Sequence, residues 1–487
     1  MLAAVAPFSP NPVEFAVGGF VSWIVLRIAG TPTMPTAVLF VLLWQWLQTF
    51  ARAVLGLIDG EDMARGVFGP WVLDAYWYML TSIVVLAIAF RVVLATLRPS
   101  APDQIVAHLG WRPIDLFLVY LGALFIAYAA RLAGAALPAL DQPMDAVARL
   151  KAGVLFVLFA SVMSSNRGLG FLVAAVLIEL AVGFSGFLAE FRGVFFVLFI
   201  AAVAVRIRWT GMTTALAAVA AIALAVLALF WTSVKSDFRV FATGSDESQN
   251  IKVPVDVRLG YLGNRLISPG EIDWSEASYL LVHRLAYVDI FGSVIGVKSV
   301  APEQGDLRQW GDALAHVFQP RILFPNKPPL SDTEVFVRLA RGDTAEQMRA
   351  ATSISVGYLA ENYADLGFPG MLLGVFAIGA VLGLICRYFA TRALPWVVSQ
   401  GLIVAFLYAV AGNGVEVSLP KLLGAGVMIS VVYAVLGPSS PCRSACAGST
   451  NGRQWPVAKK FCVDRPGRHR RRAIEAAARR LAVVIRG

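Results

Sequence analysis

Runs of about 20 mostly apolar residues recur along the chain and constrain its fold more than any other feature. A helix of that length crosses the ~30 Å hydrocarbon core of a bilayer. Of the 487 residues, 58% are hydrophobic and 15% are charged, which is more apolar surface than a soluble fold of this size buries. We therefore predict an all-α polytopic membrane protein with about eleven transmembrane helices. The spans are expected to begin near Val13, Pro35, Trp71, Ile114, Lys151, Gly168, Gly193, Met212, Gly367, Trp396 and Lys421.

A single long polar segment interrupts the spans and divides the chain. We expect a first bundle part of about eight helices at 1–235, a loop with amphipathic helices at 236–366, a second bundle part of about three helices at 367–437, and a basic, disordered tail at 438–487. No cleavable signal peptide is expected, because no basic stretch precedes the first apolar run.

Short loops between the spans alternate in charge. Arginine lies in every second connection, whereas acidic residues lie in those between. The arginines are Arg98, Arg112, Arg167, Arg206, Arg208, Arg387 and Arg392. By the positive-inside rule these loops are cytoplasmic. The N-terminus and the long loop are then expected outside the cytoplasm, and the tail inside it.

The tail accounts for the net charge. Residues 438–487 hold twelve Lys or Arg and two Asp or Glu, which equals the formal +10 of the whole chain. The body therefore offers no basic surface for nucleic acid, and the tail is typical of a segment attracted to anionic lipid head groups. Cys442 and Cys446 lack the further ligands of a zinc site.

Within the long loop, 273–298 has the pattern of one amphipathic helix. Asp273 and Glu276 have the spacing of a capping box, and apolar residues recur at helical intervals. We expect this helix to lie on the membrane surface or to pack on the bundle, with His283 and Arg284 on its polar side.

The next part of the loop reads HVFQPRILFPNKPPLSDTE from His316. Its prolines end a helix near Phe318. Ser331 and Glu334 then open a short helix to about Arg341. Because a helix N-terminus attracts anions, we expect Arg321, Lys327 and this N-terminus to converge on one anion. The alternative is that both cations reach lipid head groups.

Glu361 and Asp365 lie one helical turn apart just before the ninth span. Two like charges at this spacing raise the proton affinity of one of them, which suits a general base. The alternative is a surface carboxylate or an ion pair. Arg131, near the outer end of the fourth span, either reaches the interface or faces a polar cavity. Gly370, Gly374, Gly379 and Gly383 favour close packing of the ninth span.

Several motifs are absent, and their absence restricts the chemistry. The chain has no phosphate loop, no H-E-x-x-H, no G-x-S-x-G and no D-x-D. An outward-facing site also has little access to nucleoside triphosphates. In a group transfer the leaving group must then already be attached to the donor, as in a lipid-linked diphosphate.

The order of these features resembles the O-antigen polymerase (Wzy) and oligosaccharide repeat-unit polymerase family. That family shows P-R-x-x-[FW]-P-[DN]-K-P followed by G-x-x-x-E-x-Y in a long outside loop. Here the matching residues are Pro320, Arg321, Phe324, Pro325, Asn326, Lys327 and Pro328, and then Gly357, Glu361 and Tyr363. The match covers the loop and the general topology.

This resemblance implies a GT-C-like bundle in the bacterial inner membrane, acting as a glycosyltransferase. It would join undecaprenyl-diphosphate-linked repeat units into an O-antigen, capsule or exopolysaccharide, with a flippase and a chain-length regulator as partners. Arg321 and Lys327, with Arg284 and Arg131, would stabilise the departing diphosphate. Glu361, with Asp365 in reserve, would be the base, and Tyr363 would contact substrate. The scheme requires no metal or other cofactor.

Three other functions remain open at this point. An O-antigen ligase would share the bundle and the arginines. A transporter or flippase of lipid-linked oligosaccharides would show internal repeats and broken helices in both halves, and the sequence has neither. A scaffold for polysaccharide export would leave the clustered proline, arginine and lysine unexplained.

Overall fold

A computed structural model describes residues 5–65, 69–97, 111–185, 191–207, 210–244, 252–268, 270, 272–300, 307–319, 324, 327, 331–341, 354–392 and 394–436. Within these ranges every regular element is a helix. The chain forms two units, Met1–Ala434 and Val435–Gly487. The second unit is described only at its first two residues, so the predicted basic tail lies outside the described residues.

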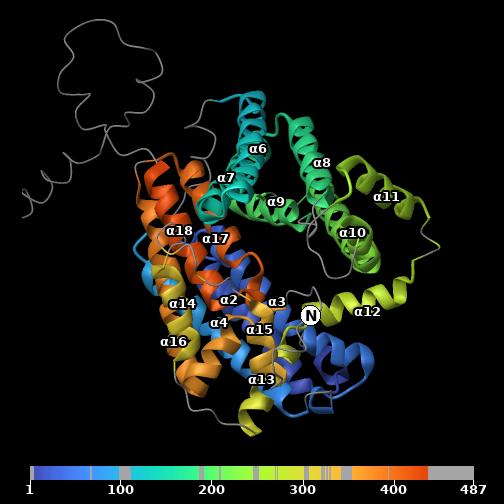
Figure 1. Ribbon diagram of the computed structural model, residues 1–487, viewed down its shortest axis with the longest axis vertical. Coiled ribbons are helices and arrows are strands. Elements are labelled where there is room, and N and C mark those ends of the chain that lie inside the picture. Colours follow the sequence, from blue (N-terminus) through green and yellow to red (C-terminus); the bar gives the residue numbers. More distant parts are fainter. Residues whose placement is uncertain are drawn as a thin grey trace, which may run out of the picture. The chain divides into compact units, whose positions relative to one another are not determined.

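Eleven apolar helices correspond to the predicted spans (Figure 1). They are α2 (Pro12–Ala29), α3 (Thr36–Asp59), α4 (Trp71–Leu94), α6 (Pro113–Ala136), α7 (Asp141–Ser165), α8 (Leu169–Ser185), α9 (Arg192–Ala204), α10 (Gly211–Thr243), α16 (Tyr358–Thr391), α17 (Trp396–Ala411) and α18 (Leu419–Leu436). Seven of them are long and apolar enough to cross a membrane, which supports a polytopic membrane protein. The other four, α8, α9, α17 and α18, are shorter apolar helices, so the count of eleven spans stays a prediction.

Three boundaries differ from the prediction, two of them beside the long loop. Helix α7 begins at Asp141 instead of near Lys151. Helix α10 continues to Thr243 instead of ending near Lys235, and α16 begins at Tyr358 instead of near Gly367. Gly367 instead interrupts α16, with a left-handed φ of 61°. The first turns of α16 therefore extend the ninth apolar helix into the polar segment and carry Glu361 with it.

Glycines in α16 allow the close packing that the sequence favours. A Cβ added at Gly379 would lie 2.8 Å from the Cβ of Ala89, and one at Gly383 would lie 3.2 Å from the Cβ of Val93. Both neighbours belong to α4. Because side chains would not fit there, the two backbones can approach closely.

The long loop contributes α11 (Val255–Ile267), α12 (Trp274–Leu285), α13 (Val288–Val300), α14 (Arg308–Phe318), α15 (Asp332–Phe336) and a π-helical turn, η5 (Val337–Arg341). Asp273 caps α12 by accepting a hydrogen bond from the Glu276 N–H at 2.9 Å. Ser331 caps α15 in the same way from Glu334 at 3.2 Å. Both predicted caps are confirmed, as is the helix end at Phe318.

The prediction of one continuous helix from Asp273 to Lys298 is wrong. The chain bends by 54° between α12 and α13, because Ala286 leaves the helical conformation and the Tyr287 N–H bonds back to Leu285. Tyr287 is buried, and its hydroxyl donates to the Ser355 carbonyl. The bend lets α12 pack on α3 and α10 while α13 packs on α4.

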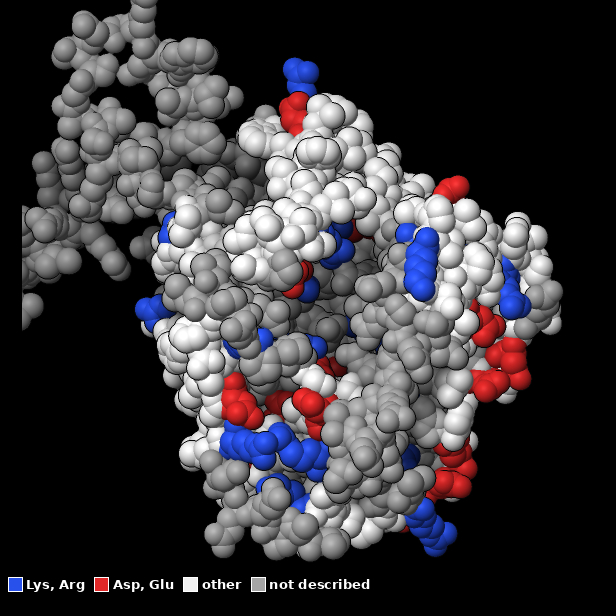
Figure 2. Space-filling model, viewed as in Figure 1, with Lys and Arg blue, Asp and Glu red and all other residues white. Residues whose placement is uncertain are grey.

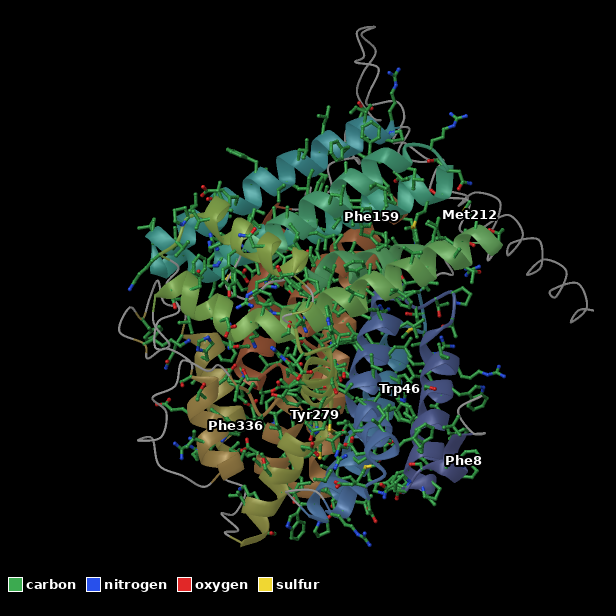
Figure 3. All side chains as sticks on the ribbon, turned by 90° about the vertical axis from the view of Figure 1, so that its right-hand side faces the viewer. Phe8, Trp46, Phe159, Met212, Tyr279 and Phe336 are labelled. Atoms are coloured by element: carbon green, nitrogen blue, oxygen red, sulfur yellow. The ribbon has the colours of Figure 1, made fainter. Side chains whose placement is uncertain are left out.

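The apolar helices do not all run in one direction. In the view of Figure 3, α10, which begins beside the labelled Met212, runs across the direction of α3, which carries Trp46. The face seen in Figure 1 is hollowed near its middle, and both basic and acidic side chains lie along the walls of this hollow (Figure 2). Charged groups from distant parts of the sequence can therefore meet inside the bundle unit.

Candidate functional site

The first turn of α16 meets α14, α15 and the start of α18 in a group of carboxylates that we call the acidic junction: Asp332, Glu361 and Asp365. Gly357 sets the direction of this turn. Its φ is 83°, and a Cβ there would lie 2.1 Å from the Val415 carbonyl oxygen, so glycine is needed. The Tyr358 N–H then donates to the Val417 carbonyl at 2.7 Å.

Glu361 points into the protein. Its side chain is 1% exposed, and its Oε2 accepts a hydrogen bond from the Leu419 N–H at 2.5 Å. Leu419 begins α18, so this carboxylate satisfies a free N–H and opposes the positive end of that helix. Its charged neighbours are Asp332, Asp365 and Arg338. The sequence-predicted base is thus already bound to backbone.

Asp365 also bonds to backbone. Its two carboxylate oxygens accept from the N–H groups of Gln309 at 3.1 Å and Trp310 at 2.8 Å, and the residue is 5% exposed. These N–H groups lie in the first turn of α14. Asp365 therefore caps a helix that lies more than 50 residues away in sequence.

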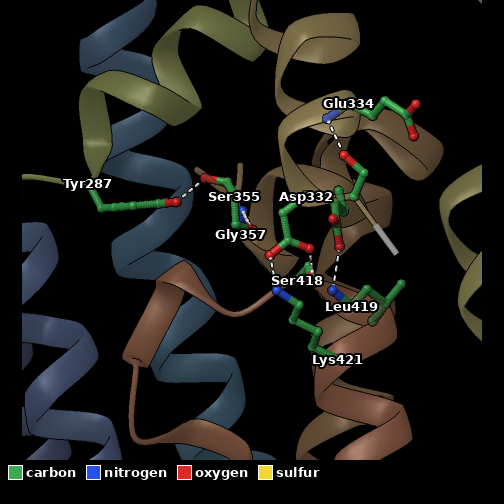
Figure 4. Close-up of polar contacts among 10 residues, drawn as sticks. Tyr287, Asp332, Glu334, Ser355, Gly357, Ser418, Leu419 and Lys421 are labelled. Atoms are coloured by element: carbon green, nitrogen blue, oxygen red, sulfur yellow. Dashed lines mark hydrogen bonds and ion pairs between the residues drawn. The ribbon is translucent and has the colours of Figure 1, made fainter. Parts of the chain in front are cut away.

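Asp332 completes the junction (Figure 4). Its oxygens accept from the Ser418 hydroxyl at 2.9 Å and from the Lys421 ammonium at 2.6 Å. The start of α15 therefore carries its own carboxylate, which is paired with α18. An external anion at this N-terminus would meet that carboxylate, which is contrary to the expected convergence of Lys327 and the helix start on one anion.

The other sequence-predicted residues that the structure describes have surroundings of their own. Lys327 donates from its ammonium to the carbonyls of His316 at 2.5 Å and Gln319 at 3.0 Å, at the end of α14. The Tyr363 ring stacks on Tyr78 at 5.8 Å, on the face of α16 opposite Glu361. Arg131 is exposed on α6. Arg321 lies outside the described residues.

Arg284 lies elsewhere, in what we call the basic cluster: Arg192, Lys235, Arg239 and Arg284, from α9, α10 and α12. Arg239 and Arg284 interact electrostatically with Lys235. Arg192, Arg284 and Lys235 in turn act on Glu416, which lies in the short 3-10 helix η7 (Gly414–Glu416) between α17 and α18.

Glu416 is a carboxylate that lies beside three of these cations. Gln48 of α3 donates to its Oε1 at 2.9 Å. Burial raises the pKa of Glu416 although three nearby cations act in the opposite direction. Its carboxyl group therefore takes up a proton at a higher pH than an exposed glutamate does.

Two cations of the cluster, Lys235 and Arg284, are not held by direct contacts. Lys235 is half-buried, and neither its ammonium nor the Arg284 guanidinium makes a hydrogen bond or ion pair with any part of the chain that the structure describes. Arg192 donates to the Asn413 side chain. Arg284 is exposed and Lys235 is half-buried, so their N–H donors remain available for an anion.

Sequence reasoning identified Arg284 but missed Arg192, Lys235, Arg239 and Glu416. The available signal was weak. Each lies at the end of an apolar run on the side expected to be outside, where charged residues are ordinary. Among the described residues, no group of three His, Cys, Asp or Glu side chains lies close enough to hold a metal ion.

Comparisons with known proteins leave the chain without an assigned family. No family model matches it, and no curated protein and no solved structure matches it either.

Proposed function

We propose that the protein is a glycosyltransferase of the bacterial inner membrane. It would polymerise undecaprenyl-diphosphate-linked oligosaccharide repeat units into an O-antigen, capsule or exopolysaccharide at the outer membrane face. The observation that carries this proposal is that the Lys235 ammonium and the Arg284 guanidinium, beside the half-buried carboxylate of Glu416, make no hydrogen bond or ion pair to the described part of the chain. The resemblance in the long loop supplies the substrate class.

The reaction makes two electrostatic demands. A sugar hydroxyl of the incoming unit attacks the anomeric carbon of the growing chain, and the bond from that carbon to the diphosphate oxygen breaks. The lipid diphosphate leaves with the bonding electrons and needs positive charge around it. The hydroxyl proton passes to a carboxylate.

We assign the diphosphate to the basic cluster, with Lys235 and Arg284 as its principal contacts. Arginine offers a planar fork to phosphate oxygens, and lysine offers a compact charge. Lys327 and Arg131 of the sequence-based assignment are not included, because the Lys327 ammonium holds the end of α14 and Arg131 is exposed on another helix. Arg321 lies outside the described residues, so its part in the assignment stays a prediction.

We assign the proton acceptor to Glu416. It lies beside three cations of the cluster, so a sugar bound through its diphosphate would be near this carboxylate. A raised pKa brings a carboxylate closer to the value that suits a general base. Glu361 and Asp365 were the sequence-based candidates, and both bond to backbone N–H groups.

Purified protein in proteoliposomes, supplied with lipid-linked repeat units, tests the proposal. Wild-type protein should produce long chains, whereas Lys235→Gln and Arg284→Gln should lower the rate roughly 10²- to 10³-fold, as loss of a charge-stabilising donor does elsewhere. Chain length on gels and the amount of remaining single units are measured.

Arg265→Gln is the matched control, because Arg265 lies in the same loop and has a carboxylate partner, Asp237, at 3.6 Å. It should polymerise like wild type. Normal chains from the two cluster variants would contradict the site. Transfer to a lipid A core without polymerisation would point to a ligase, and movement of units across the vesicle membrane without transfer would point to a flippase.

A further inference from the structure

A cavity of about 200 Å³ lies among α2, α3, α9 and α17, away from the region where Gln48, Arg192 and Glu416 meet. It is lined by the α2–α3 connection, the starts of α3 and α17, and the end of α9. Arg192 begins α9 and Arg206 follows its end, so the basic cluster and the cavity are roughly 20 Å apart along this helix. The cavity is therefore separate from the site proposed above.

Two polar side chains that line the cavity lack partners. Gln400 is 7% exposed, and its amide makes no hydrogen bond to the described part of the chain. The hydroxyl of Thr36 is buried and also has no partner among the described residues. Buried polar groups are nearly always hydrogen-bonded. Two such groups among the lining residues of one cavity indicate a bound polar molecule.

The electrostatics of the cavity favour an anion. Arg206 lines it, and none of the described lining residues is Asp or Glu. Helices α3 and α17 both begin there after a proline, Pro35 and Pro395, and neither helix has a side-chain cap. The third N–H of each helix bonds to the carbonyl of the preceding proline, so the first two N–H groups and the positive ends of both helix dipoles are left for a ligand.

The cavity is also held in shape. The Arg91 guanidinium donates to the hydroxyls of Thr31 and Thr33, each at 3.0 Å, which fixes the α2–α3 connection. Arg206 adopts a left-handed φ of 50°, a conformation that is uncommon for arginine. That backbone conformation brings a cation to the wall of the cavity at the end of α9.

The geometry points to a binding site for one phosphate group in this cavity, held by Arg206, Gln400, Thr36 and the starts of α3 and α17. A volume of about 200 Å³ is below the ~300 Å³ of the smallest usual ligand pockets, so it suits a phosphate with a few attached atoms. Arginine-bearing loops at this end are expected to face the cytoplasm. The phosphate then belongs to an anionic lipid head group or to a small soluble phosphate.

Retention of phosphatidylglycerol against phosphatidylcholine by the full-length protein, measured by native mass spectrometry, tests the lipid source. Titration with inorganic phosphate by calorimetry tests the soluble source. Arg206→Asn removes the charge and keeps a residue that tolerates a left-handed φ. Gln400→Leu removes the amide at similar volume. Each should weaken binding at least about tenfold, the usual effect of losing a hydrogen bond to a charged group.

Arg167→Asn is the matched control, since Arg167 is exposed in another connection expected on the same side. It should bind like wild type. Phosphatidylglycerol retained selectively and displaced by phosphate would identify a lipid site, whereas phosphate binding without lipid selectivity would identify a soluble ligand. Equal retention of both lipids with no phosphate binding, or equal binding by Arg206→Asn and the control, would overturn the site. Neither result bears on the basic cluster.

Discussion

The acidic junction and the basic cluster both gather ionisable groups, but they differ in how far these groups are already paired. At the junction, Glu361 and Asp365 bond to backbone N–H groups of other helices. In the cluster, Lys235 and Arg284 have no such partner in the described part of the chain. Satisfied buried groups stabilise a fold, whereas cations without a direct partner keep their N–H donors for a ligand. The pairing thus separates structural carboxylates from candidate ligand-binding cations.

The comparison is tested most strongly by replacing one carboxylate in each region with its amide. We expect Glu416→Gln to lower the rate of polymer formation by roughly 10²- to 10⁴-fold, as expected when a general base is lost, at unchanged thermal stability. Glu361→Gln should retain polymerisation and unfold at a lower temperature, because the amide is a weaker acceptor for the Leu419 N–H. Proteoliposome assays and thermal unfolding in detergent measure both.

The reverse outcome would restore the sequence-based assignment. An inactive Glu361→Gln protein with wild-type stability, together with an active Glu416→Gln protein, would place the base at the acidic junction.

Removal of Asp365 should have a large effect on stability. Asp365→Ala leaves two N–H groups of α14 without an acceptor, and we expect a loss of roughly 3 kcal/mol in the free energy of unfolding. Asp365→Asn keeps an acceptor and should lose less. Chemical unfolding in micelles measures both variants. Equal stability of all three proteins would show that Asp365 does not hold α14 in place.

The pH dependence sharpens the contrast further. Because burial raises the pKa of Glu416 above the ordinary 4.5, its carboxylate is protonated as the pH falls, earlier than an exposed glutamate. Once neutral, it no longer competes for Arg192, Lys235 and Arg284. Inorganic diphosphate should therefore bind more tightly as the pH falls through this range, while polymerisation slows.

Calorimetric titration of diphosphate at several pH values measures this effect, and Glu416→Gln is the control. Its diphosphate affinity should already be high and should not change across that range. A wild-type affinity that changes with pH in the same way as that of the variant would rule out Glu416 as the titrating group.

The smallest effect is expected far from both regions. Asp62 accepts hydrogen bonds from the Asn11 amide at 2.8 Å and the Ala64 N–H at 2.9 Å, and the bond from Asn11 is the main cause of its lowered pKa. The ionised form thus adds stability above the unfolded pKa, and this contribution is lost as the pH falls through the folded pKa. Asp62→Asn should shift thermal unfolding slightly at pH 7 and not at pH 2. Identical shifts at both pH values would contradict this.

Much of the secondary structure could be predicted, because it depends on neighbours in the sequence. The starts of α4 and α17 coincide with the predicted residues Trp71 and Trp396. Two caps were also correct. The bend at Ala286 was missed, since it depends on Tyr287 reaching Ser355, 68 residues away.

The candidate site was predictable only in part. Glu361 stood out because it belongs to a dense local motif, yet its partner Leu419 lies 58 residues further on. Lys235 and Glu416 are 181 residues apart in the printed sequence, and neither belongs to a pattern. No local rule reports that two such charges meet.

The sequence by itself determined the apolar helices, their caps and the division of charge between the body and the tail, since these follow from hydrophobic periodicity and short-range hydrogen bonds. Only the tertiary structure decided which charges are neutralised. Pairing depends on contacts between helices that are distant in the sequence. Inside the protein each hydrogen bond is stronger, and each unpaired polar group costs more free energy, than in water. For this reason Glu361 and Asp365 were found bonded to backbone N–H groups, and Lys235 and Arg284 of the basic cluster became the candidates for ligand binding.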